Sequence, residues 1–95
     1  MTMKLVKPEE MENQVGVSLP AGEWFEIDQA RINAFADCTE DHQFIHLDEE
    51  AAAQTPFGGT IAHGFLTLSL LTKLCAENGI YPEGIVMGVN YGLDK

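Results

Sequence analysis

The sequence predicts an α+β domain in which a sheet wraps around one buried helix. Residues 63–78 are apolar on nearly all sides at helical spacing, with a leucine at every fourth position from Leu66 to Leu74. Segments 22–27 and 85–95 carry the alternating, β-branched and aromatic residues that are typical of strands. Two strands cannot cover such a helix, so we expect a fold that is incomplete at its C-terminal end. Further sequence, a partner chain or both would complete it.

Shorter elements are expected between the first strand and the long helix. Asp28 is a typical N-cap for a helix over residues 29–38, because its carboxylate can accept the free backbone N–H groups of the first turn. Residues 39–47 show no helical period and are predicted to form a loop. Asp48 is predicted to open a second short helix, and Pro56 with the following glycine pair predicts a turn.

Length and composition indicate one soluble domain. The chain has 95 residues, of which we assign 1–21 to an N-terminal arm or first helical turn and 22–95 to a single domain. Its net charge of −10 would repel phosphate backbones and anionic lipids, so neither nucleic acid nor a membrane is an expected partner. The two isolated cysteines and the lack of a signal-peptide pattern predict a cytoplasmic protein.

Two groups of residues suggest chemistry. Asp41 and His46 lie five positions apart in the predicted loop, where a carboxylate and an imidazole can converge on one water molecule for general acid–base work. From spacing alone, the plainer reading is a pair of solvated surface residues. His63 and Gly64 stand at the head of the long helix, where free N–H groups can bind a developing oxyanion. The plainer reading is a turn glycine beside a structural, hydrogen-bonded histidine.

The stretches FADCTEDHQFIHLDEEAA (35–52) and FGGTIAHGFLTLSLL (57–71) carry a family resemblance. Together they closely resemble the MaoC-like, (R)-specific enoyl-CoA hydratase family, and in particular its NodN-like members. The family loop usually reads Gly-Asp-x-Asn-Pro-Ile-His, and its helix opens with Ile-(Ala/Val)-His-Gly. The resemblance covers roughly residues 22–95 and implies a hotdog fold, in which an antiparallel sheet wraps a long central helix, commonly as a homodimer.

The resemblance implies site residues as well. It places the catalytic pair on Asp41 and His46, the oxyanion-hole N–H on Gly64, and a supporting hydroxyl on Thr72, with His63 also in a supporting role. Three positions depart from the family pattern: Glu40 replaces Gly, Gln43 replaces Asn and Phe44 replaces Pro. None of them removes a catalytic group. Gln43, Phe44 and Phe65 are the residues expected to line the substrate pocket.

The implied reaction is hydration of a trans-2-enoyl-CoA, or dehydration of the (R)-3-hydroxyacyl-CoA, with no cofactor besides the CoA thioester substrate. One alternative is a hotdog acyl-CoA thioesterase. Another is a non-catalytic partner that binds acyl thioesters or completes the sheet of another chain. A metal site built from His42 and His46 with Glu40 or His63 is a further alternative, although their helical spacing lies in a segment without helical period, so we expect no metal.

Overall fold

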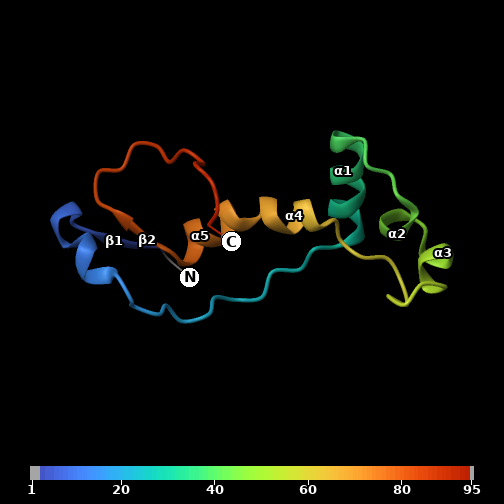
Figure 1. The fold of residues 1–95 in the computed structure, drawn as a ribbon, viewed down its shortest axis with the longest axis horizontal. Helices are drawn as coiled ribbons and strands as arrows, with labels where there is room; N and C mark the ends of the chain where they lie inside the picture. The colour runs from blue at the N-terminus through green and yellow to red at the C-terminus, as the bar shows by residue number, and fades with distance from the viewer. Residues whose placement is uncertain (1–2, 95) are drawn as a thin grey trace. The chain divides into compact units, whose positions relative to one another are not determined.

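Two units make up residues 3–94, the part of the chain that a computed structural model describes (Figure 1). One unit joins the residues up to Gly22 with those from Lys73 onward, and the other is Glu23–Thr72. The predicted division into an arm over 1–21 and a domain over 22–95 stays a prediction.

The unit that contains both chain ends is built on a pair of short strands. Strand β1 (Lys4–Val6) pairs with β2 (Ile80–Pro82), and Leu5 lies opposite Tyr81. Helix η1 (Pro8–Gln14), a 3-10 helix, follows β1 with its proline at the first position, where the missing N–H costs nothing. The pair is parallel. The antiparallel sheet expected from the sequence is therefore not formed among residues 3–94.

Helix α1 (Gln29–Thr39) begins where the sequence predicts and ends one residue later than predicted. The backbone N–H of Arg31 donates to Oδ1 of Asp28 at 2.9 Å, which confirms the N-cap. The helix ends because Glu40 adopts a left-handed conformation with φ 61°. Ile32 and Ala36 form its buried face.

Helix α2 (Phe44–Leu47) occupies part of the segment predicted to be a loop, and that prediction was wrong. Its single turn is closed by the N–H of Asp48, which donates to the carbonyl of Phe44 at 2.9 Å, and four residues are too few to show a period in the sequence. Helix α3 (Glu49–Ala53) is capped by Asp48 as predicted, through a 3.0 Å bond from the Ala51 N–H. Helix α2 lies between α1 and α3 and contacts both (Figure 1).

The long helix expected over residues 63–78 is broken into α4 (Gly64–Ser69) and α5 (Leu71–Asn78). Two hydroxyls explain the break, because the side chains of Thr67 and Ser69 donate back to the carbonyls four residues earlier, at 3.4 and 2.6 Å. Such bonds bend a helix. The N–H of Leu70 is then shared between the carbonyls of Leu66 and Thr67, each at 3.2 Å.

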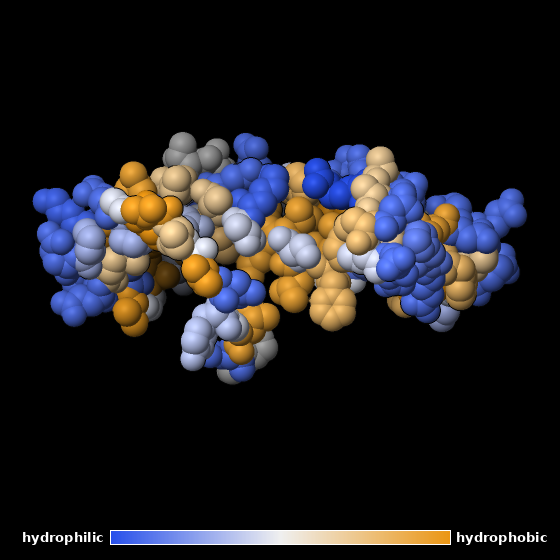
Figure 2. All heavy atoms as spheres, turned by 90° about the horizontal axis from the view of Figure 1, so that it is seen from above, coloured by the Kyte–Doolittle hydropathy of each residue, from blue (hydrophilic) through white to orange (hydrophobic). Residues whose placement is uncertain are grey.

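Apolar residues remain on the surface (Figure 2). The segments predicted as strands over 22–27 and 85–95 form no strand within residues 3–94. A strand is defined by backbone hydrogen bonds to a neighbouring strand, and neither segment has such a neighbour there. Trp24, in the segment 22–27 that was predicted as a strand, is fully exposed at 103%. The predicted all-round burial of the long helix is likewise not observed, since three of its apolar residues are exposed: Phe65, Leu68 and Leu71.

No helix in the described part of the chain combines the length and the apolar character that crossing a membrane requires.

The cap of α1 can be tested by mutation. Replacing Asp28 with Ala is expected to lower the free energy of unfolding by about 1 kcal/mol, because the Arg31 N–H loses its acceptor. Replacing Asp28 with Asn keeps an acceptor oxygen and should leave stability close to that of the wild type. Urea unfolding followed by circular dichroism measures both values. Equal stability of the two variants would show that the cap does not contribute.

Candidate active site

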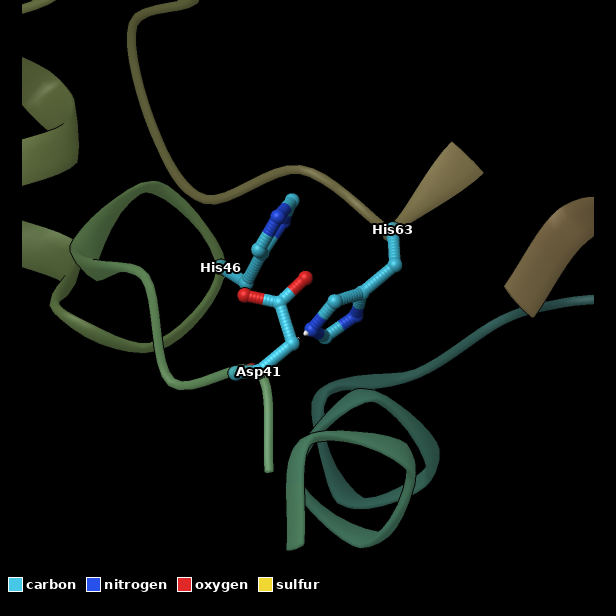
Figure 3. Close-up of side chains that lie close together, drawn as sticks. All are labelled: Asp41, His46 and His63. Carbon is cyan, nitrogen blue, oxygen red and sulfur yellow. Dashed lines mark hydrogen bonds between the residues drawn. The ribbon is translucent and has the colours of Figure 1, made fainter. Parts of the chain in front are cut away.

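Three side chains from separate segments meet in the unit Glu23–Thr72. They are Asp41, in the turn after α1, His46 in α2, and His63 immediately before α4 (Figure 3). One side-chain oxygen or nitrogen atom of each lies within 4.8 Å of the others. The carboxyl group of Asp41 points toward the two imidazole rings (Figure 3). We call these three residues the Asp–His–His cluster.

His46 is buried, with 6% of its surface exposed, and its orientation is set by backbone groups. Its Nδ1 lies 2.7 Å from the carbonyl oxygen of Ile61. A carbonyl only accepts, so Nδ1 carries the hydrogen, and in the neutral ring Nε2 is then a free acceptor. The Nε2 of Gln29 donates to the carbonyl oxygen of His46 at 2.8 Å and holds its backbone as well. His46 therefore presents one basic nitrogen in a fixed orientation.

Asp41 owes its place to the left-handed residue that precedes it. Because Glu40 turns the chain at the end of α1, the N–H of Asp41 donates to the carbonyl of Ala36 at 3.1 Å. The N–H of Gln43 donates to Oδ1 of the carboxylate at 3.3 Å. The side chain is nevertheless exposed. Asp41 therefore offers a carboxylate that water and a ligand can reach.

His63 connects the other two members. It is 2% exposed, and its Nε2 donates to the backbone carbonyl of Asp41 at 3.1 Å. Its ring stacks on the ring of His46, with centroids 3.8 Å apart and planes 24° apart. The ring of Phe35 packs against it at 4.9 Å in a tilted arrangement.

A layer of side chains behind the cluster was not predicted from the sequence. Besides holding the carbonyl of His46, Gln29 accepts at Oε1 a bond of 2.8 Å from the hydroxyl of Thr60. That hydroxyl also lies 3.0 Å from Oε2 of Glu49, so its single hydrogen is shared between two acceptors. Nothing marks a glutamine in the first turn of a helix as a support for a histidine seventeen residues later. The carbonyl of Ile61 carries no sequence signal at all.

The structure brings some of the predicted site residues together and leaves others apart. Gly64 is the first residue of α4, directly after His63. Gln43 and Phe44 stand at the start of α2 and are exposed, as is Phe65 in α4. Thr72 lies in α5, where no hydrogen bond within residues 3–94 joins it to Asp41 or His46. The roles of these residues stay predictions.

The geometry of the cluster suits acid–base chemistry better than metal binding. His42 is exposed, and its Nε2 lies 3.0 Å from Oδ1 of Asp37, so it does not join His46 as the alternative metal site requires. His46 and His63 lie close enough for a metal, but imidazole lone pairs lie in the ring planes. Two stacked rings 24° from parallel cannot direct such lone pairs at one ion. A free imidazole nitrogen beside a carboxylate is an arrangement that can hold and deprotonate water.

The chain resembles known proteins over most of its length. The family model described as "MaoC like domain" matches residues 10–95. Nodulation protein N of Rhizobium meliloti is 51% identical over 87 residues, which are 90% of this chain and 54% of that protein. The 3-hydroxyacyl-thioester dehydratase Z of Mycobacterium tuberculosis is 48% identical over 81 residues, 84% of this chain and 52% of that protein.

A 3-hydroxybutyryl-CoA dehydratase of Methylorubrum extorquens is 47% identical over 61 residues, covering 59% of this chain and 39% of that protein. The chain thus spans about half the length of the relatives that match most of it.

The turn that positions Asp41 yields a stability prediction. A non-glycine residue in the left-handed region is disfavoured, so replacing Glu40 with Gly should raise the free energy of unfolding by about 1 kcal/mol. Replacing Glu40 with Ala keeps the Cβ that causes the strain and should give no comparable gain. Thermal or urea unfolding of the two variants is the measurement. A Gly variant no more stable than the Ala variant would contradict the strained turn.

Proposed function

Since the chain belongs to the family of MaoC-like domains, we propose that it interconverts a trans-2-enoyl thioester and the (R)-3-hydroxyacyl thioester by acid–base catalysis. The observation that carries the proposal is the Asp–His–His cluster, in which an accessible carboxylate lies beside a buried imidazole with a free Nε2. Two relatives are named as dehydratases of a 3-hydroxyacyl thioester and of 3-hydroxybutyryl-CoA, which supports the same reaction class here.

The residues divide the reaction between them. Asp41 and His46 hold a water molecule, and one of them takes its proton as the oxygen bonds to Cβ of the enoyl chain. The Cα–Cβ electron pair shifts toward the thioester carbonyl, which becomes enolate-like. The proton taken from the water then passes to Cα, directly or through the other residue, so the atoms of one water are added across the double bond. Dehydration is the same path in reverse.

The N–H of Gly64 is proposed to bind the enolate-like oxygen. It is the first residue of α4, where backbone N–H groups lack partners within the helix, and no side chain caps this helix. A methyl group added to Gly64 would meet no atom of residues 3–94 within 4 Å beyond its two chain neighbours and the backbone of its own helix. Its φ also lies outside the left-handed region. The backbone therefore does not require a glycine, which supports the close approach of an acyl group.

The substrate proposed is an acyl-CoA or a related acyl thioester. The net charge of −10 leaves little positive charge for the CoA phosphates, so basic groups outside this chain are expected to contribute. Gln43, Phe44 and Phe65 are proposed to line a pocket for the acyl chain, and all three are exposed. Thr72 is proposed to support the reaction through its hydroxyl.

A hotdog fold and a homodimer complete the proposal. Supporting it, exposed apolar residues stand on α4 and α5 and along residues 85–93, which an antiparallel sheet or a second copy of the chain would cover. The same exposed residues favour a second candidate function, a non-catalytic partner that completes another chain's sheet. The two candidates differ in that only the first converts the enoyl thioester.

Replacing Asp41 with Asn, or His46 with Gln, is expected to lower the turnover of trans-2-enoyl-CoA hydration by about 10²–10⁴-fold, because each change removes a proton-transfer group. Loss of enoyl-thioester absorbance measures turnover. The assay uses the chain itself and a chimera in which it replaces the matching region of the M. tuberculosis dehydratase Z, so that the part of that protein outside the match is present as well.

The matched controls are Asp37→Asn and His42→Gln. They change an exposed Asp–His pair, 3.0 Å apart, that lies outside the cluster, and both should keep wild-type turnover. Wild-type rates in a folded Asp41→Asn or His46→Gln variant would contradict the proposal. Binding of acyl-CoA without turnover, in both the chain and the chimera, would favour the non-catalytic partner.

The proposed role of the Gly64 N–H can be tested by replacing Gly64 with proline, which has no N–H. Proline is favoured at the first position of a helix, and His63 before it already has the extended conformation that proline requires, with φ −60° and ψ 136°. Gly64→Pro should therefore fold and yet lower turnover by about 10²–10³-fold. Gly64→Ala keeps the N–H and adds a methyl group, so it should raise KM more than it lowers kcat. Equal turnover in the two variants would contradict the proposed oxyanion hole.

A further inference from the structure

We propose that His63 is a positioning residue, a neutral imidazole that fixes both Asp41 and the ring of His46 in their working arrangement. The inference deepens the proposed function and rests on it, because it assigns a task within the same site. It follows from the partners of each ring nitrogen, from the stacking of the two rings and from the backbone of Asp41.

The partners of His63 favour its neutral form. Its Nε2 faces the carbonyl of Asp41 at 3.1 Å and must carry a hydrogen, because a carbonyl cannot donate. Its Nδ1 is buried and has no hydrogen-bond partner in the described part of the chain. A proton on Nδ1 would create a buried cation with a donor that no acceptor satisfies. The ring therefore remains neutral, with its hydrogen on Nε2, and does not serve as a proton relay.

The stack then restricts the ring of His46. With centroids 3.8 Å apart, rotation of His46 toward a perpendicular orientation would drive its ring edge into His63. A half-turn would move Nδ1 away from the carbonyl of Ile61 and break the 2.7 Å bond. The ring of Phe35 packs against His63 at 4.9 Å and gives it a second aromatic contact. Only one orientation and one tautomer of His46 satisfy these contacts, and they leave Nε2 free.

The same residue anchors Asp41. The backbone of Asp41 is held through its N–H, which donates to Ala36 at 3.1 Å, and through its carbonyl, which accepts from His63 at 3.1 Å. The side chain itself is exposed and has few contacts of its own. His63 thus connects the carboxylate to the imidazole through one rigid ring, although it touches neither reacting atom.

Two substitutions separate the two contacts of His63. His63→Phe keeps an aromatic ring for stacking but loses the donor to Asp41, and His63→Gln keeps an N–H donor but loses the stack. Long-range ¹H–¹⁵N spectra of the labelled chain report the tautomer of each histidine directly. In the wild type we expect hydrogen on Nδ1 of His46 and on Nε2 of His63.

His63→Gln should give a mixture of His46 tautomers, whereas His63→Phe should keep the Nδ1–H form. In the chimera both variants should lower kcat by about 10- to 100-fold, with a smaller change in KM, since positioning rather than binding is lost. The matched control is His42→Gln, which changes an exposed histidine next to Asp41. It should change neither the His46 tautomer nor kcat.

An unchanged His46 tautomer in folded His63→Gln would overturn the inference, and so would a cationic His63 in the wild type. Turnover equal to that of the wild type in both variants would overturn it as well. The spectra do not depend on activity. Expected tautomer changes without any hydration by the wild type would therefore refute the proposed function and leave the positioning role supported.

Discussion

The candidate site depends on one hydrogen bond, from Nδ1 of His46 to the carbonyl of Ile61 at 2.7 Å. A return bond from the N–H of Ile61 to the carbonyl of Ile45, at 3.0 Å, makes the connection reciprocal. These two bonds join α2 to the segment that leads into α4, fifteen residues further along the chain. His63 and Gly64 stand only two and three residues after Ile61, so the two bonds fix where the second imidazole and the first N–H of α4 lie relative to His46. One backbone carbonyl thus sets both the tautomer of His46 and the location of its neighbours.

The cluster divides charge and burial in a way that suits its proposed chemistry. Its carboxylate is exposed, where water stabilises the negative charge, and its two imidazoles are buried, where a neutral ring costs less than a cation. The ends of the short helices position the members of the cluster. Asp28 and Asp48 each accept one N–H at the start of α1 and α3, and the left-handed Glu40 ends α1 so that Asp41 lies next to the rings. Local helix chemistry thereby contributes to the geometry of a site that joins residues 41 and 46 to residue 63.

Sequence patterns predicted the parts of this fold that local interactions decide. Both aspartate caps are visible in the sequence because a cap is formed within four residues, and the pairing of Asp41 with His46 was predicted because the two lie in one short segment. The break at Leu70 was missed because it arises from hydroxyls bonding back along a helix that looks continuous by its apolar pattern. Trp24 is exposed although its segment was predicted to belong to the sheet around the buried helix, because burial depends on neighbours that the segment itself does not contain. The support from Gln29 and Ile61 was missed because amide and backbone contacts leave no pattern.

Positions 40 and 64 show how backbone and ligand requirements can be told apart. At position 40 the chain turns with φ 61°, a conformation that favours glycine, and yet a glutamate stands there. At position 64 neither the conformation nor the space demands glycine, and a glycine stands there. Glu40 therefore carries backbone strain in the turn that positions Asp41. The glycine at position 64 is explained by nothing inside the described chain, so its cause is best sought in a group that approaches from outside, against the N–H that α4 leaves free.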